Sequence, residues 1–280
     1  TVVGIAGLTA KFAQCVVKAL QAYPDVTIKG FCRSPTKLPQ AALDKYSIEI
    51  IQGNFDDEGA VHALVRGCDI VICCYYGDND VMTRGQKILI DACVNEGVPR
   101  YVPSDFAKVK GVHILVGALM ETFWSPFFHI FDISNETISY WGTGDEKWDL
   151  TTYETAAAYA AALLVDKDAS GIFRFRGDYK SVLEIKASYE KIYQAPLHLK
   201  CLGSLDELYR VIRSQFKEDP DNVAAWGPGC FMYWCTNGIA HLGDNLNNQS
   251  YPTIVALDLE GFLRSNKREE IHTADQRLGF

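Results

Sequence analysis

TVVGIAGLTAKFAQCVVKAL, residues 1–20, is the stretch that decides the fold. An apolar run meets Gly4 and Gly7 and passes directly into a helical pattern from Lys11. This order predicts a strand, a tight turn and a helix. We expect Gly4 to supply the positive φ of the turn and Gly7 to let the backbone approach a bound group. Ala10 stands where a third small residue lets such a helix pack on its strand.

A turn of this kind directs backbone N–H groups and a helix N-terminus at one point, which favours a diphosphate. The spacing here is G-x-x-G-x-x-A, whereas ordinary dinucleotide-binding enzymes have G-x-G-x-x-G. A glycine pair is weak evidence by itself, and a plain strand–helix turn is the alternative. The residues that follow the later strands decide between the two.

Strand and helix patterns alternate over the first half of the chain. Further apolar strands are predicted at 26–31, 47–52, 69–75 and 100–103, with helices at 39–46, 57–66 and 81–96. The fourth strand is almost wholly apolar, as in a parallel sheet that is covered on both faces. The pattern predicts an α/β fold: a Rossmann-like, doubly wound parallel sheet whose ligand lies beyond the carboxyl ends of the strands.

The segment after the second strand reads Cys32-Arg33-Ser34-Pro35-Thr36-Lys37. A site for NAD would place Asp or Glu here to hold the ribose 2′-hydroxyl. Arg33, Ser34 and Lys37 suit a 2′-phosphate instead, because an acid would repel it. A solvated basic loop is the alternative, but the glycine turn upstream favours NADP(H).

Polar and aromatic residues also follow the later strands. We expect Asn54 and Phe55 to meet the adenine, and Tyr75, Tyr76 and Gly77 to lie along the cofactor. The fifth strand is followed by a further expected contact segment, made of Pro103, Ser104, Asp105 and Phe106.

Composition excludes several classes of protein. The 280 residues are 48% hydrophobic, which is ample for a large core. A net charge of −8 without a basic run argues against nucleic acid, and the absence of ~20 consecutive apolar residues argues against a membrane span. No leader pattern precedes the first strand. The nine cysteines lack a C-x-x-C pair and the six histidines are scattered, so we expect reduced core thiols, a cytoplasmic protein and no metal.

The motifs together resemble the NmrA-like and isoflavone-reductase-like family, a branch of atypical short-chain dehydrogenases. The matching segments span nearly the whole chain: GIAGLTA, RSPTK, GNFDD, QKILIDACVNEGVPRYVPSDF and YPTIVALDLEGFLRS. The resemblance implies that the segment PSDF lies beside the nicotinamide. It also implies NADPH binding by Gly4, Gly7, Leu8, Thr9, Ala10, Arg33 and Lys37. A Tyr-x-x-x-Lys pair is absent, as in this branch.

The chain departs from its relatives after Phe106. Relatives continue with a loop and a helix that carries the lysine proposed as general acid, whereas the next strand, 112–116, starts here almost at once. A crossover between parallel strands needs about a dozen residues. We therefore expect a break between Phe106 and Val109, most favoured at Ala107–Lys108, whose absent segment would be a lid that carries the proton donor. Lys108 then has no catalytic role, and Asp105 caps the loop or holds the ribose more readily than it serves as an acid.

The second half has a different pattern. Residues 1–116 are the expected NADP-binding core, and 117–280 mainly a smaller α+β lobe for substrate, with some segments returning to the core. Glu follows Thr151, Ser181 and Ser204 at the third position, which predicts three helix starts. Aromatic residues crowd the segment 117–131 and recur at 226–234. Each one packs in a core more often than it binds ligand, but as a set they suit a large apolar pocket: Met120, Phe123, Trp124, Phe127 and Trp234.

The favoured hypothesis is an NADPH-dependent reductase of a hydrophobic, conjugated small molecule, such as an intermediate of secondary metabolism. A non-enzymatic NADP-binding sensor that regulates a partner protein is the alternative, and only this alternative requires a protein partner. The dense aromatic run favours the enzyme. A cyclase or isomerase that uses bound NADP stays open.

Overall fold

The computed structural model describes residues 1–103 and 111–280, and the chain divides into two compact units. Unit 1 comprises Thr1–Leu115, Ala156–Phe173 and Leu278–Phe280. Unit 2 comprises Val116–Thr155 and Arg174–Arg277. The sequence therefore leaves unit 1 and returns to it twice.

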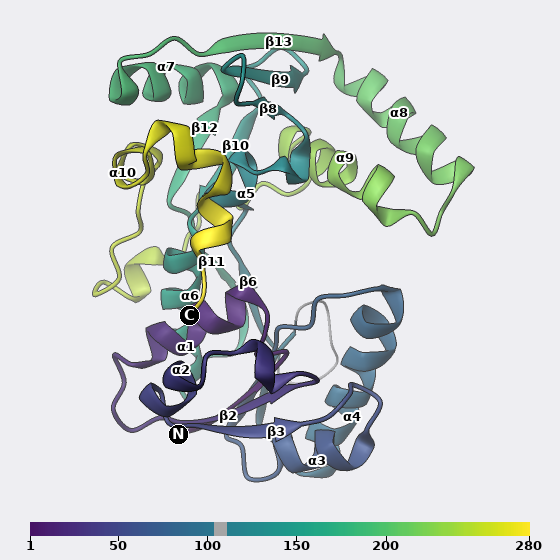
Figure 1. The fold of residues 1–280 in the computed structure, drawn as a ribbon, viewed down its shortest axis with the longest axis vertical. Helices are drawn as coiled ribbons and strands as arrows, with labels where there is room; N and C mark the ends of the chain where they lie inside the picture. The colour runs from purple at the N-terminus through teal and green to yellow at the C-terminus, as the bar shows by residue number, and fades with distance from the viewer. Residues whose placement is uncertain (104–110) are drawn as a thin grey trace. The chain divides into compact units, whose positions relative to one another are not determined.

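A five-stranded parallel sheet, β3-β2-β1-β4-β5, forms the centre of unit 1 (Figure 1). Its strands are β1 (Val2–Ala6), β2 (Thr27–Cys32), β3 (Ile48–Gln52), β4 (Ile70–Cys73) and β5 (Arg100–Val102). The strand order reverses at β1, which pairs with β2 on one side and with β4 on the other. This strand order confirms the predicted fold class. Open sheets of this kind bind their ligands at such a reversal.

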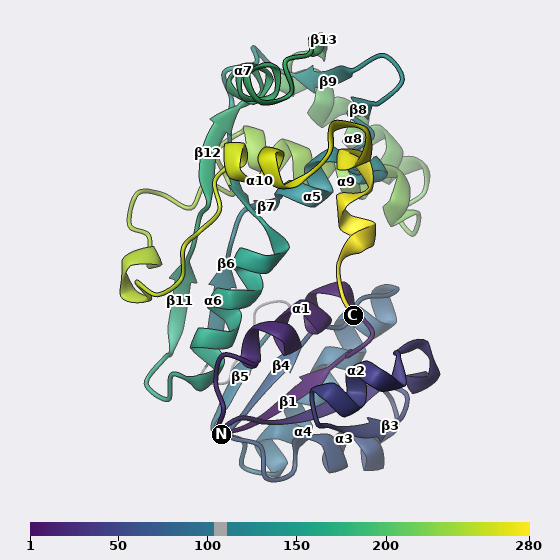
Figure 2. The same ribbon diagram turned by 60° about the vertical axis from the view of Figure 1, so that its left-hand side comes forward.

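Helices cover both faces of this sheet, with α3 and α4 on the face opposite α1 (Figure 2). They are α1 (Lys11–Leu20), η1 (Pro35–Lys37), α2 (Gln40–Lys45), α3 (Glu58–Val65), the π-helical turn η2 (Val81–Gly85) and α4 (Gln86–Asn95). The apolar side chains of α3 and α4 pack against Phe31, Val71 and Tyr101 from the strands. Six of the nine cysteines are buried in this unit, as expected of core residues.

Two further strands, β6 (Val112–Leu115) and β11 (Gly171–Arg174), form a separate two-stranded sheet. Gly111, just before β6, makes a parallel bridge with Tyr101 of β5. The expected break between Phe106 and Val109 falls in 104–110 and so lies outside the described residues.

Buried Arg100 fixes the end of helix α6 (Tyr153–Val165) against β5. Its guanidinium donates to the carbonyl oxygens of Leu163 at 3.2 Å and Leu164 at 3.0 Å, and also to that of Asp166. The last carbonyls of a helix have no partner within it. One buried cation therefore satisfies the C-terminal end of a helix that returns to unit 1 from the second half of the chain.

Unit 2 contains two three-stranded sheets, β12-β10-β7 and β13-β9-β8. The strands are β7 (Ala118–Leu119), β8 (Phe131–Asp132), β9 (Thr137–Trp141), β10 (Lys147–Thr151), β12 (Asp178–Ser181) and β13 (His198–Gly203). The helices are α5 (Met120–Trp124), η3 (Pro126–Phe128), α7 (Val182–Tyr193), α8 (Leu205–Glu218), α9 (Val223–Thr236), η4 (Asn248–Ser250), α10 (Leu259–Ser265) and η5 (Arg268–Arg277).

Two of the three predicted helix starts in the second half are confirmed. Ser181 and Ser204 form complete capping boxes at the starts of α7 and α8. The prediction at Thr151 is wrong by one residue. Thr151 ends β10 and its hydroxyl accepts from the Gly177 N–H at 3.1 Å, whereas the hydroxyl of Thr152 accepts from the Thr155 N–H at the start of α6.

No helix among residues 1–103 and 111–280 combines the length and the apolar character that a membrane crossing requires.

Candidate functional site

The turn after β1 holds the two glycines that the sequence singles out, but their roles differ from those expected. Gly7 has φ +88°, and a Cβ on it would lie 2.7 Å from the carbonyl oxygen of Cys74. Gly7 is therefore required both for the left-handed backbone and for its close approach to the end of β4. The expectation that Gly4 takes the positive φ is wrong: Gly4 lies inside β1, where a Cβ would meet Cys68 and Val71 at 3.1 Å.

Backbone hydrogen bonds fix this turn against the neighbouring strand. The N–H groups of Gly7 and Leu8 both donate to the carbonyl oxygen of Phe31, at 2.9 Å. The N–H of Ala10 donates back to the Gly7 carbonyl, also at 2.9 Å. Ala10 is the N-cap of α1 and carries no side-chain acceptor for the N–H groups of the first helical turn. An acceptor from outside, such as a diphosphate oxygen, suits that position.

An open cavity of about 170 Å³ lies at this turn, beyond the ends of β1, β2 and β4. Eight of the predicted cofactor residues line it: Gly7, Thr9, Ala10, Arg33, Asn54, Phe55, Tyr75 and Tyr76. The lining also includes four residues that were not predicted: Phe31, Cys32, Cys74 and Val81. The first three of these belong to or adjoin apolar strands, so their pattern predicts burial and gives no sign of a site.

Charge in this cavity comes from one side chain. Of the lining residues that the structure describes, Arg33 alone carries a formal charge, and it is exposed. Burial raises the pKa of the Cys32 and Cys74 thiols and of the Tyr75 hydroxyl, so these groups are neutral near pH 7. A cation beside an uncharged floor favours an anionic ligand.

The ring of Phe55 is held in place at the rim. Arg84 lies over it, 5.8 Å from its centroid, and a Cβ on Gly85 would come within 3.1 Å of it. Both come from the π-helical turn η2, and such turns are frequent at functional sites. Asn54 beside it donates one amide hydrogen bond to Asp56 at 2.8 Å. A fixed aromatic face and an amide suit a planar heteroaromatic ring.

Other predicted cofactor residues are not part of the cavity lining. Leu8 is fully buried and fills the space that Gly30 leaves open in β2. Ser34 is the half-buried N-cap of η1, and Lys37 is an exposed residue at its end. The remaining ones, Gly77 and Pro103, lie after β4 and β5. Ser104, Asp105 and Phe106 lie outside the described residues.

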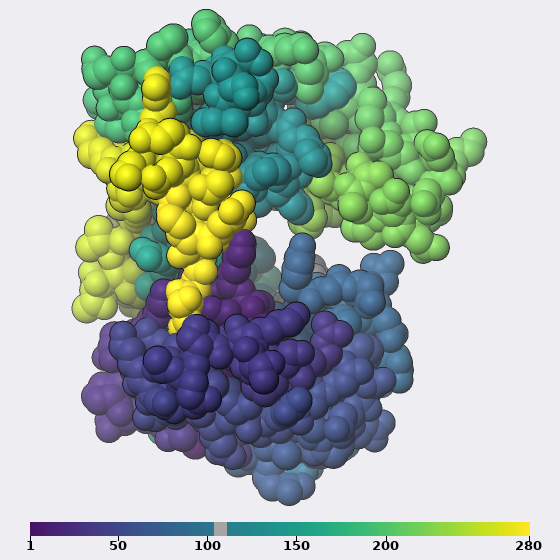
Figure 3. Space-filling view, in the orientation of Figure 1, coloured from purple at the N-terminus to yellow at the C-terminus, as the bar shows by residue number. Residues whose placement is uncertain are grey.

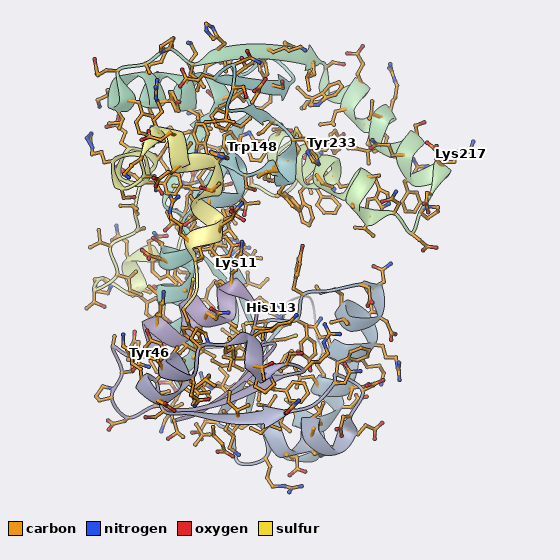
Figure 4. The ribbon with its side chains drawn as sticks, in the orientation of Figure 1. Lys11, Tyr46, His113, Trp148, Lys217 and Tyr233 are labelled. Carbon is orange, nitrogen blue, oxygen red and sulfur yellow. The ribbon has the colours of Figure 1, made fainter. Side chains whose placement is uncertain are left out.

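The five predicted substrate residues separate into two groups. Met120, Phe123 and Trp124 are at most 2% exposed and form part of the core of unit 2, where Phe123 packs edge-on against Trp148 (labelled in Figure 4). Their apolar character serves packing, because the short helix α5 turns these three large side chains toward that core. Phe127 and Trp234 are instead exposed, at 38% and 43%.

The two exposed residues are linked through a third aromatic side chain. Phe231 on α9 is 49% exposed, with its ring centroid 6.0 Å from that of Phe127 and 5.6 Å from that of Trp234. This aromatic row, Phe127–Phe231–Trp234, belongs wholly to unit 2. Phe231 is not among the residues predicted from the sequence, although its spacing from Trp234 on one helix is a signal that could identify it.

No group of three or more His, Cys, Asp and Glu side chains that could hold a metal ion occurs within residues 1–103 and 111–280.

The glycine turn, the uncapped start of α1 and the charge of Arg33 together fit a phosphorylated dinucleotide. Comparison with known proteins agrees with this fit. Residues 7–130 match the family described as NAD(P)H-binding. No curated protein matches the chain.

Several solved structures share the fold at low sequence identity. AtPrR2 with NADP+ and (+)pinoresinol is 16% identical, with a TM-score of 0.76 over 94% of this chain and 97% of that one. The quinone oxidoreductase QOR2 of Escherichia coli with NADPH is 16% identical, with a TM-score of 0.73 over 95% and 99%. Leucoanthocyanidin reductase of Vitis vinifera with NADPH gives the same identity, TM-score and coverage.

Residues 7–130 therefore match an NAD(P)H-binding family and the chain has the fold of isoflavone reductase, which agrees with the resemblance found in its sequence.

Proposed function

We propose that this protein is an NADPH-dependent reductase of a hydrophobic, conjugated small molecule. The observation that carries the proposal is the cavity at the Gly7 turn: among its described lining residues Arg33 is the single charged one, and none is Asp or Glu. Arginine favours a 2′-phosphate there. Lys37, exposed at the end of η1, is a second cation in the same segment and would add to this preference.

The residues divide the work of binding between them. The start of α1 and the Gly7 turn would hold the diphosphate, Arg33 the 2′-phosphate, and Phe55 with Asn54 the adenine. When bound, the nicotinamide supplies the hydride. The contribution of this chain is to fix the cofactor. The backbone hydrogen bonds of the Gly7 turn hold the shape of the turn for this purpose.

The aromatic row Phe127–Phe231–Trp234 supports an apolar substrate. Three exposed rings in succession offer a surface that stacks on a flat, conjugated molecule and does not suit a sugar or a small acid. AtPrR2, which has the same fold, was solved with (+)pinoresinol. From the aromatic row we propose a conjugated aromatic substrate, from secondary metabolism, in a cytoplasmic protein.

A single-turnover experiment tests the proposal. The protein is mixed with NADPH and a panel of conjugated phenolics and quinones, and the nicotinamide absorbance is followed. Oxidation of NADPH by at least one aromatic substrate supports the reductase. NADPH binding without oxidation across the panel favours the non-enzymatic sensor, and substrate conversion without net oxidation favours the isomerase or cyclase.

Cofactor preference is tested separately, by titration with NADPH and NADH. A charge-assisted contact is worth about 1.5–3 kcal/mol, so we expect NADPH to bind at least about tenfold more tightly. Arg33→Ala should remove most of this preference and leave NADH binding nearly unchanged. Lys45→Ala, which removes an exposed cation of α2 outside the cavity lining, is the control. Equal affinities for the two cofactors in the unmodified protein contradict the proposal.

A further inference from the structure

The last three residues of the chain return to unit 1 and contact α1. The N–H of Phe280 donates to the side-chain carbonyl oxygen of Gln14 at 2.7 Å, and Lys18 donates to the Gly279 carbonyl. The ring of Phe280 stacks on Tyr46, which follows α2 and is labelled in Figure 4, with the centroids 5.2 Å apart. Both ribbon views place the end of the chain, marked C, beside α1 (Figures 1 and 2), and Figure 3 draws the same molecule with space-filling atoms.

Gln14 makes a second hydrogen bond with its other amide atom. Its side-chain N–H donates to the carbonyl oxygen of Thr9 at 3.1 Å. Thr9 lines the cofactor cavity and belongs to the turn between Gly7 and α1. One half-buried side chain thus contacts both the segment Leu278–Phe280 and the turn that would receive the diphosphate.

These contacts fix one peptide plane of the turn from both sides. The peptide between Thr9 and Ala10 donates its N–H to the Gly7 carbonyl and accepts at its C=O from Gln14. Without the bond from Gln14, the carbonyl side of this peptide loses its partner and the plane is held at the N–H alone. The N–H groups that follow at the start of α1 depend on the orientation of this plane, and binding weakens when a site must be ordered by its ligand.

We propose that Gln14 is a positioning residue that couples docking of Leu278–Phe280 to cofactor binding at the Gly7 turn. The proposal rests on the NADPH site proposed above. Coupling of this kind is reciprocal: the docked segment favours NADPH, and NADPH favours the docked segment by the same factor. The segment follows η5 directly in the chain. The last helix of unit 2 is therefore covalently joined to the residues that contact Gln14.

Two variants separate the two bonds of Gln14. Gln14→Leu removes both. Gly279→Ala disturbs only the contact with the segment, since a Cβ there would lie 2.4 Å from the side-chain oxygen of Gln14 and the residue has φ +100°. Gly97→Ala is the matched control in unit 1: Gly97 has φ +71° and no heavy atom within 4 Å of the added Cβ.

The first measurement is the dissociation constant for NADPH in the full chain. A neutral hydrogen bond is worth about 0.5–1.5 kcal/mol, so Gln14→Leu should weaken NADPH binding about twofold to tenfold. Gly279→Ala should have a smaller effect, and Gly97→Ala none. The double variant should bind no more weakly than Gln14→Leu alone, because both changes break one relay. Circular dichroism and thermal melting establish that each variant is folded.

The second measurement is hydrogen exchange of the amides in 278–280, with and without NADPH. NADPH should slow this exchange in the unmodified chain, and Gln14→Leu should abolish the effect. Folded Gln14→Leu that binds NADPH normally, losses that multiply in the double variant, or exchange unaffected by NADPH each overturn the relay. These outcomes leave the NADPH site intact, whereas an unmodified chain that binds no NADPH overturns both proposals.

Discussion

Replacing Gly7 with alanine should destabilise the fold itself, in addition to any loss of cofactor. From the sequence alone, we expect a larger residue at this position to abolish binding and leave the fold intact. The structure corrects that expectation. The added Cβ would lie 2.7 Å from the carbonyl oxygen of Cys74, 2.8 Å from its carbonyl carbon and 3.1 Å from the Tyr75 nitrogen. All three are backbone atoms, and the Cys74 N–H is tied to Ala6 of β1 at 2.8 Å, so the strand end cannot easily move.

Two costs make up the expected loss for Gly7→Ala. A left-handed backbone costs a residue with a Cβ about 1–2 kcal/mol. Overlap with fixed neighbours costs about 1–3 kcal/mol more. We therefore expect a loss of about 2–5 kcal/mol in the free energy of unfolding.

A second glycine separates these costs. Gly67, after α3, has φ +73° but no heavy atom within 4 Å of an added Cβ. Gly67→Ala should therefore lose only the backbone cost, about 1–2 kcal/mol. Urea unfolding of both variants, followed by circular dichroism without cofactor, gives the two values. Equal losses for the two variants would refute the claim that contact with β4 is what requires glycine at position 7.

Three further predictions concern stability. Burial raises the pKa of Glu121 to about 7 from its ordinary value of 4.5. The folded state therefore binds this proton more tightly than the unfolded state does. The free energy of unfolding should fall as the pH rises from about 4.5 to 7, by up to about 3 kcal/mol. Glu121→Gln should lose that fall in urea unfolding over this pH range; an unchanged pH profile would exclude Glu121 as its source. Arg100→Met should lower the free energy of unfolding by about 3–5 kcal/mol, because it leaves buried carbonyl groups at the end of α6 unpaired. Arg84→Met, at an exposed ion pair, should lower it by under about 1 kcal/mol in the same assay. Asp57→Ala should cost about 1 kcal/mol, because the Asp57 side chain caps α3 at the Ala60 N–H; a thermal melt unchanged from wild type would contradict this.

The parallel sheet could be predicted from the sequence because its signals are local. Apolar runs such as 69–75 and turn residues between them need no knowledge of distant parts of the chain. The same holds for the capping boxes at Ser181 and Ser204. In each, a serine and the glutamate three residues later exchange side-chain to backbone hydrogen bonds, so four consecutive residues decide the helix start. At Thr151 the local signal failed, because its hydroxyl is used by Gly177, which is distant in sequence.

The candidate site could be predicted only where the type of a residue, such as its charge, indicates by itself what it binds. Arg33 in place of an acid indicates an anionic ligand, and the structure places it in the cavity lining. Gly4 and Gly7 look alike in sequence, and only the neighbours of each show which one the turn requires. Burial likewise distinguishes two residues of the same type: Trp124 is buried, whereas Trp234 is exposed.

The order in which the chain visits unit 1 has a consequence for biosynthesis. Unit 1 needs α6 and the segment Leu278–Phe280, which leave the ribosome long after its sheet. Until α6 is made, the guanidinium of Arg100 lacks the carbonyls that it binds in the finished protein. A nascent chain ending near residue 115 would thus hold a sheet with incomplete cover, so this protein should depend on chaperones during synthesis more than a domain made from one continuous segment does.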